Sequence, residues 1–488
     1  MAGKLLKIPA GKLDPGMFLA ELDRPWIESP LLFQEYVIED QDELKWVRKN
    51  CAFVMVDPAR SLVPIDPDLT SKVVAPPPEP EPTRIEKKPE PEPERGSEIT
   101  LTLRQPLRPT DQGADTMFFS MLTEQLRMIL ARLFHSGAKV DKALITPKRG
   151  GSEVNQSKEQ VAIANAIYDY ARDLYGGQAR AVFRGENPDL EVLKQVVLPM
   201  VDCVTLSPDA MACVVRLRHA DEYASAHALA TLVWSLIFAK SLELKDEELL
   251  EVGLAALMLD FGMLRLPREL LRKQGKLSDE ERKKFRDHVG LSLELARKAG
   301  KLSPKVERMI ECHHERFDGS GYPRGLSGDN IPAMGRMMGL SDTYAAMTLT
   351  RPGAPANSAF KVLRQLKAQG GVLFDKKLVE VFIRAMGVFP TGSLVELNTG
   401  EVAIVVEQNN QRRLRPRVML VLDSAKQPME QNPLVNLDTK PSDPSDPEAL
   451  WILNGMEPGS HGVDPRDYYF SEVSRNHGTN MGEPALQG

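Results

Sequence analysis

The sequence has few of the features that would place a protein outside the cell or in a membrane. Only four cysteines occur among its 488 residues, and none form a CxxC pair, which predicts reduced thiols rather than a disulfide framework. No apolar run approaches the roughly 18–20 residues that span a bilayer, and the beginning of the chain lacks an apolar segment of signal-peptide length. We therefore expect a cytoplasmic protein without a membrane span.

A strong excess of one charge is also absent. The 62 Lys and Arg residues and 68 Asp and Glu residues give a formal net charge of −6, and no dense basic stripe is interleaved with aromatic residues. A nucleic-acid partner is therefore not expected. With 42% hydrophobic and 27% charged residues, the composition is that of an ordinary globular protein, and the length predicts two to four domains.

Hydrophobic periodicity separates the first half of the chain into distinct parts. Residues 1–73 alternate strand-like pieces, PGMFLAEL and CAFVMVD, with one helical piece, DQDELKWVRKN, and so predict a small α/β domain. Residues 74–98 are rich in Pro and Glu and predict an extended linker. Helical spacing of three and four then predicts helices over 114–190 and onward to 385, interrupted by a loop at 146–160.

Alternating apolar residues replace the helical pattern after residue 388. The stretch GSLVELNTGEVAIVVEQNNQ predicts a β-hairpin around NTG, and RVMLVLD adds a third strand, so residues 388–425 predict a small antiparallel sheet. Residues 426–488 have few core-forming runs apart from ALWIL and predict an irregular tail with a disordered end. The expected fold class is mainly α, with a small α/β domain before the helices and a β segment after them.

Histidines gather in the helical part. Five of the eight lie between 219 and 314, among them His227, His288 and the adjacent pair His313 and His314. Neutral imidazoles and carboxylates bind Fe, Mn, Zn or Ni, and helices that each present one such group inward can build a metal site. For His227 or His288 taken alone, a hydrogen-bonded core histidine is the alternative.

A glycine-rich loop follows the histidine pair, in HHERFDGSGYPRGLSGDNIP. Its glycines and Pro323 allow the backbone to approach a ligand closely, and free N–H groups there suit phosphate oxygens. A surface loop without a function is the alternative. Upstream, the stretch MLDFGM places Asp260 among apolar residues, where a carboxylate has to find a partner on folding.

Together these motifs resemble the HD-GYP domain, a helical branch of the HD phosphohydrolase superfamily that hydrolyses cyclic di-GMP at a site of two or three metal ions. The resemblance covers residues 195–385 and rests on DEYASAHA at 221–228, LDFG at 259–262, the His288 segment, HHERFDGSGYPRGL at 313–326, SDTYAAMT at 341–348 and RP at 351–352. It implies that the metal ligands are His227, Asp260, His288, His313, His314 and Asp342, and that Asp260 is the catalytic carboxylate that bridges two ions. It further implies that Arg351 contacts substrate phosphate, and that Gly321, Tyr322 and Pro323 contact substrate or a diguanylate cyclase domain.

Some positions depart from the family pattern. Leu259 and Met263 stand where the family usually has a His and a Lys around the Asp, and RPGAP from residue 351 lacks the aromatic and second basic residue usual there. One group of ligands is thus short of a residue while the other is complete, so we expect one divalent ion, Fe or Mn, rather than two. Two functions stay open: a slow cyclic di-GMP phosphodiesterase, and a catalytically inactive module that senses cyclic di-GMP or docks a partner. Nothing in the sequence indicates the oligomeric state.

Overall fold

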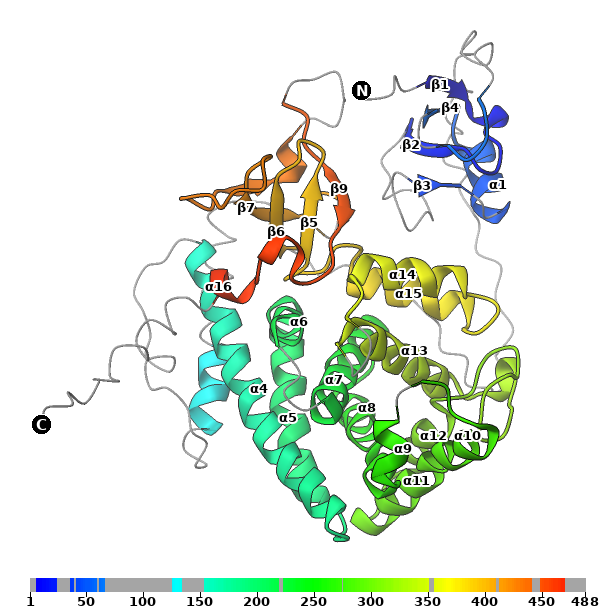
Figure 1. Ribbon diagram of the computed structural model, residues 1–488, viewed down its shortest axis with the longest axis vertical. Helices are drawn as coiled ribbons and strands as arrows, with labels where there is room; N and C mark the ends of the chain where they lie inside the picture. Colours follow the sequence, from blue (N-terminus) through cyan, green and yellow to red (C-terminus); the bar gives the residue numbers. More distant parts are fainter. Residues whose placement is uncertain are drawn as a thin grey trace, which may run out of the picture. The chain divides into compact units, whose positions relative to one another are not determined.

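The computed structural model describes residues 6–23, 36–38, 41–58, 61–65, 125–133, 153–218, 223–273, 275–350, 355–409, 412–440 and 448–469. The chain divides into two compact units, Met1–Thr102 with Ser442–Ala449, and Leu103–Pro441 with Leu450–Gly488 (Figure 1). The linker predicted at 74–98, Arg351 and the end of the predicted tail lie outside the described residues. What the sequence predicts for them stays a prediction.

The first unit contains a four-stranded antiparallel sheet and one helix. Its elements are β1 (Leu6–Pro9), β2 (Phe18–Leu22), β3 (Tyr36–Val37), α1 (Gln41–Asn50) and β4 (Phe53–Asp57), with the strands in the order β1-β4-β2-β3. Ile8, Val47 and Val54 are fully buried in its core. The sequence predicted β2, α1 and β4 but not β1 and β3, because strands of four and two residues are too short to show a period.

Helices make up most of the second unit. They are α4 (Glu153–Phe183), α5 (Leu190–Leu206), α6 (Pro208–Leu217), α7 (Tyr223–Ser241), α8 (Asp246–Met258), α9 (Arg268–Arg272), α10 (Asp279–Arg286), α11 (His288–Ala299), α12 (Pro304–Cys312), α13 (Ala333–Thr348), α14 (Ala359–Ala368), α15 (Lys376–Met386) and α16 (Arg466–Tyr469). Residues 125–133 are also helical. The loop predicted at 146–160 is wrong from Glu153 onward, because Glu, Gln and Lys after the glycines are good helix formers.

None of the described helices is by itself long and apolar enough to cross a membrane. Helices α5 and α6 reach that length and apolarity only as a pair, and the pair is bent by 118° at its break.

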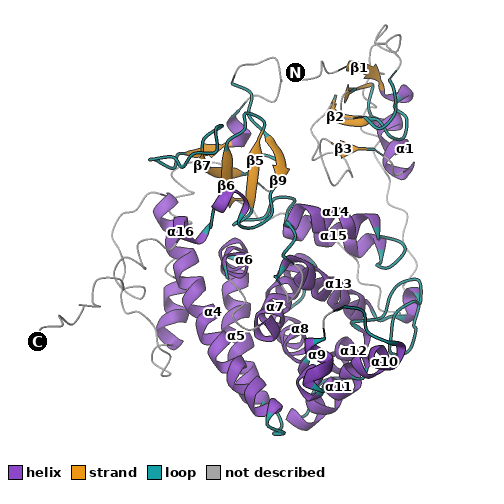
Figure 2. Cartoon of the chain, in the orientation of Figure 1, coloured by secondary structure: helices purple, strands orange, loops and turns teal. Residues whose placement is uncertain are grey.

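Helix α7 is the central helix of this unit. All residues from His227 to Ala239 are buried, and α7 packs against α8, α13, α15 and α4–α6 (Figure 2). Such surroundings follow from a sequence, ALATLVWSLIFA, that is apolar on every side of the helix. A polar side chain on α7 therefore needs a partner on a neighbouring helix, which makes the position of His227 informative.

Short turns place the other candidate residues at helix ends. Helix α12 begins at the cap Ser303, whose Oγ accepts a hydrogen bond from Val306 N at 3.4 Å, and it ends at Cys312 directly before the histidine pair. Helix α10 begins in a capping box formed by Ser278 and Glu281, and only Asp287 separates its end from His288.

A five-stranded antiparallel sheet belongs to the same unit. Its strands are β5 (Leu394–Leu397), β6 (Val402–Glu407), β7 (Arg417–Leu422), β8 (Leu434–Asn436) and β9 (Ile452–Gly455), in the order β8-β7-β6-β5-β9. The predicted hairpin and third strand are confirmed as β5, β6 and β7. The irregular tail predicted from residue 426 is wrong at β8 and β9, because these short strands are stabilised by pairing with β7 and β5 rather than by a pattern of their own.

Candidate functional site

The six predicted metal ligands come from five parts of the helical unit. His227 lies on α7, Asp260 between α8 and the short 3₁₀ helix η4 (Phe261–Arg265), His288 at the start of α11, His313 and His314 just after α12, and Asp342 on α13. These helices pack against one another, α7 on α8 and α13, and α12 on α8, α11 and α13 (Figure 1). The packing brings all six side chains together in two groups that share Asp260.

The first group consists of His227, Asp260 and Asp342. The Nε2 atom of His227 lies 2.9 Å from Oδ1 of Asp342 and 3.3 Å from Oδ2 of Asp260. Burial by itself lowers the pKa of His227, but the hydrogen bonds to both carboxylates outweigh burial and raise this pKa well above its usual range. Two carboxylates that hold a proton on an imidazole in this way are also placed to bind a cation together with it.

The second group consists of Asp260, His288, His313 and His314. Oδ1 of Asp260 lies 3.5 Å from Nε2 of His288 and 4.0 Å from Nε2 of His313, and one ligand atom from each of the four residues lies within 4.8 Å of the others. Burial lowers the pKa of His313 and His314, so both imidazoles are neutral and keep a lone pair. These residues offer the donor set that a transition metal prefers.

Four buried atoms of the second group are available to bind a metal ion. Oδ1 of Asp260 and the Nε2 atoms of the three histidines have no hydrogen-bond partner among the described residues. Nδ1 of His288 donates to the carbonyl of Phe285, and Nδ1 of His313 donates to the carbonyl of Ile310, both at 2.7 Å. A carbonyl can only accept, so each contact leaves the lone pair on Nε2, as at many histidine–metal sites. The cluster therefore fits a divalent metal ion.

The MLDFGM segment turns tightly beside α11. The backbone N–H of Gly262 donates to Oγ of Ser292 at 2.8 Å, and a Cβ atom at position 262 would lie 2.0 Å from the carbonyl oxygen of His288. Only glycine fits here, and this close approach holds Asp260 next to His288. Leu259, with 2% of its surface exposed, offers no atom that can bind a metal. The first group consequently has three candidate ligands and the second has four.

Glu315 holds the GYP loop, and sequence reasoning missed it. This buried carboxylate accepts hydrogen bonds from the backbone N–H groups of Arg324 at 2.8 Å and Leu326 at 2.9 Å. The backbone N–H of Tyr322 donates to the carbonyl of His314 at 3.1 Å. The only signal that could have found Glu315 is its place directly after the histidine pair.

The tyrosine of the GYP loop faces the histidine cluster. The rings of Tyr322 and His314 lie 4.6 Å apart, and Tyr322 is half-buried. Gly321 cannot carry a side chain, because a Cβ atom there would lie 2.3 Å from the backbone N of Arg316. Pro323 is exposed. Of the predicted contact residues, Tyr322 therefore lies next to the candidate ligand His314, and Pro323 is exposed to solvent.

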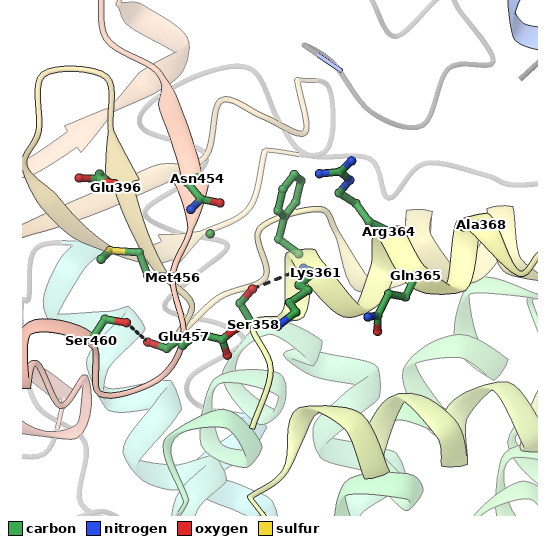
Figure 3. Close-up of a pocket in the computed structure, with 12 residues that line it drawn as sticks. Ser358, Lys361, Arg364, Gln365, Ala368, Glu396, Asn454, Met456, Glu457 and Ser460 are labelled. Atoms are coloured by element: carbon green, nitrogen blue, oxygen red, sulfur yellow. Dashed lines mark hydrogen bonds and ion pairs between the residues drawn. The ribbon is translucent and has the colours of Figure 1, made fainter. Parts of the chain in front are cut away.

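A cleft of about 590 Å³ elsewhere in the unit holds none of the predicted residues. It lies between α14 and β9, and its lining includes Lys361, Arg364, Asn454 and Glu457 (Figure 3). Nζ of Lys361 lies 3.3 Å from Oε1 of Glu457 across it. The cleft contains no histidine and is separate from the cluster around Asp260.

Three families of known proteins match parts of the chain. Residues 213–378 match the HD domain, and residues 394–442 match a KOW domain associated with HD domain. Residues 5–192 match a domain of unknown function. The histidine and aspartate cluster thus lies inside a matched HD domain.

Several curated proteins are similar to this chain. A cyclic di-GMP phosphodiesterase of Pseudomonas aeruginosa is 32% identical over 54% of this chain and 63% of its own length. The response regulator RpfG of Xanthomonas campestris, also a cyclic di-GMP phosphodiesterase, is 35% identical over 35% of this chain and 46% of its own length. A 3′3′-cGAMP-specific phosphodiesterase of Vibrio cholerae is 29% identical over 34% of this chain and 36% of its own length. The chain thus spans less than two thirds of each relative.

Among solved structures, an HDGYP protein from Bdellovibrio bacteriovorus covers 78% of this chain and 98% of its own at 11% identity and a TM-score of 0.39, a likeness too remote to support an argument. The matched HD domain makes this chain an HD-domain protein. The GYP loop beside its histidine pair, together with the curated relatives, supports membership of the HD-GYP family.

Proposed function

We propose that this protein binds cyclic di-GMP and hydrolyses it slowly, using one divalent metal ion held by Asp260, His288, His313 and His314. The observation that supports this proposal is the set of four buried ligand atoms that meet without hydrogen-bond partners among the described residues. Curated relatives are named as phosphodiesterases of cyclic dinucleotides, which agrees with it. Three imidazoles and a carboxylate favour Fe or Mn. The cytoplasm is the proposed location.

The protein residues would divide the work around the bound phosphodiester. A bound divalent ion polarises a phosphodiester and lowers the pKa of water near it. Asp260 and the three histidines would hold that ion, while the two carbonyls of Phe285 and Ile310 keep His288 and His313 in the tautomer that can bind it. Met263 stands where a lysine could protonate the leaving oxygen, a contribution of about 10²–10⁴-fold in rate. Because Met263 cannot donate a proton, we expect low turnover.

A catalytically inactive module is the second candidate. The buried Leu259 next to Asp260 favours it, because the first group of ligands has no fourth protein ligand there. Such a module would sense cyclic di-GMP or dock a diguanylate cyclase domain through the exposed part of the GYP loop. Hydrolysis separates the two candidates.

The test measures metal content, cyclic di-GMP binding and cyclic di-GMP turnover on protein loaded with iron without oxygen. We expect about one ion per chain and slow hydrolysis, both lost in His313→Ala. His461→Asn is the matched control, because His461 is exposed and its left-handed φ of 53° suits asparagine. Nucleotide binding without hydrolysis would establish the inactive module. Protein that binds no metal would overturn the proposal.

A further inference from the structure

Arg286, which the sequence did not single out, places a guanidinium group beside the candidate metal ligands. Its Cζ atom lies 4.8 Å from the centre of the Tyr322 ring. The other neighbours of that ring are His314 at 4.6 Å and His288 at 6.3 Å between ring centres. One aromatic ring thus contacts both the histidine cluster and a cation.

Backbone contacts hold the two segments that carry the partners of this stack. The carbonyl of Phe285, which orients His288, belongs to the residue directly before Arg286 on the last turn of α10. Tyr322 is held by the hydrogen bond from its N–H to the carbonyl of His314. The distance from Arg286 to the ligands is therefore set by the same two segments that position His288 and His314.

The charge of Arg286 is not neutralised within the described part of the chain. Its side chain is exposed and forms no ion pair with a described carboxylate. Other arginines around the loop are engaged: Arg316 donates to the carbonyls of His313 and Glu315, and Arg336 pairs with Asp375. Arg286 is thus a cation that has an orientation but no anionic partner.

We propose that Arg286 binds the second phosphate of a cyclic dinucleotide whose first phosphate lies at the Asp260 cluster. A guanidinium is a planar fork of N–H donors that matches two phosphate oxygens, and stacking on Tyr322 orders this fork before the ligand arrives. A nucleotide with two phosphates can reach both charged positions, whereas a nucleotide with one phosphate can reach only one. Arg286 would therefore select cyclic dinucleotides over cyclic mononucleotides. This assignment rests on the proposed function.

The experiment compares Arg286→Gln with Lys283→Gln in the full chain loaded with Mn²⁺. Lys283 is exposed on the same helix, so the control removes the same charge without touching Tyr322. Calorimetry measures binding of cyclic di-GMP, which has two phosphates, and of cyclic GMP, which has one. Thermal unfolding of each variant checks that it is folded.

We expect Arg286→Gln to weaken cyclic di-GMP binding about 10-fold or more, the usual loss for a hydrogen bond to a charged group. Cyclic GMP binding should stay within about 2-fold, and Lys283→Gln should bind both nucleotides like the unmodified protein. If a folded Arg286→Gln variant binds cyclic di-GMP as tightly as the unmodified protein, the role of Arg286 is overturned, while the proposed function is not. An equal loss in both variants, or for both nucleotides, would overturn this role too. Failure of the unmodified protein to bind cyclic di-GMP would overturn this assignment together with the proposed function.

Discussion

Replacing Gly262 by alanine should damage both stability and metal binding. The new Cβ atom would lie 2.0 Å from the carbonyl oxygen of His288 and 2.7 Å from the backbone N of Ser292, whereas real Cβ atoms keep at least 3.0 Å. The two segments must therefore separate by about 1 Å. Because both neighbours are backbone atoms of α11, no side chain can rotate away to relieve the contact.

The change in the free energy of unfolding caused by Gly262→Ala is the sum of three contributions. Overpacking costs about 1–3 kcal/mol. Loss of the hydrogen bond from Gly262 to Ser292 costs about 1 kcal/mol. Alanine recovers about 0.4–1 kcal/mol by reducing the entropy of the unfolded chain. The net destabilisation is about 1–3.6 kcal/mol, and the movement of His288 away from Asp260 should weaken metal binding by about 10–100-fold, as for other residues that orient ligands.

Gly290→Ala provides the matched control for this prediction. Gly290 lies on α11 two residues after His288, is exposed, and has no atom within 4 Å of the position a Cβ would take. This change should stabilise the helix by roughly 0.5–1 kcal/mol and leave metal content unchanged. Thermal unfolding and metal analysis on both variants check the pair. If Gly262→Ala unfolds at the same temperature as Gly290→Ala and keeps its metal, the close approach of η4 to α11 does not hold the site together.

Three other expected results follow from the site and its surroundings. Leu259→His should raise metal content towards two ions per chain, and adding Met263→Lys should raise cyclic di-GMP turnover by up to about 10²–10⁴-fold; a stable double variant with two metals and no hydrolysis would refute this. Glu315→Gln should destabilise the GYP loop by about 1.5–3 kcal/mol and speed hydrogen exchange at Arg324 and Leu326, whereas Glu294→Gln, at an exposed position of α11 where the carboxylate pairs with Lys298, should change neither rate. Burial raises the pKa of Cys312 to about 11, so its thiol should react with a disulfide reagent at pH 8 far more slowly in the folded protein than after unfolding; equal rates would contradict its burial.

The sequence predicted those parts of the fold whose apolar residues recur at a clear helical or strand spacing. Helix α7 and strands β5, β6 and β7 were expected from their apolar spacing, and each is present. Strand β9 was not expected, because its pairing with β5 is a long-range contact that leaves no trace in four residues. The early start of α4 was missed because its first turns are polar and show no apolar stripe.

Some residues of the candidate site could likewise be predicted from the sequence, and others could not. His313 and His314 could be found from their adjacency and from the loop that follows, and the resemblance to HD-GYP domains supplied the other ligands. The roles suggested here for Glu315 and Arg286 depend on which backbone groups and rings lie near them after folding. No spacing in the sequence encodes such contacts, because α10 and the GYP loop meet only in three dimensions.

Strand β9 has a consequence for where this chain can be shortened. The matched KOW domain ends at residue 442, but β9 follows it at Ile452–Gly455 and forms one edge of the sheet beside β5. A chain that stopped at residue 442 would leave the N–H and C=O groups of β5 open to pairing with other molecules. It would also uncover Phe360 on α14, since a Cβ atom at Gly455 would lie only 2.8 Å from that residue. A shortened protein of this kind should self-associate even though every predicted metal ligand is still present.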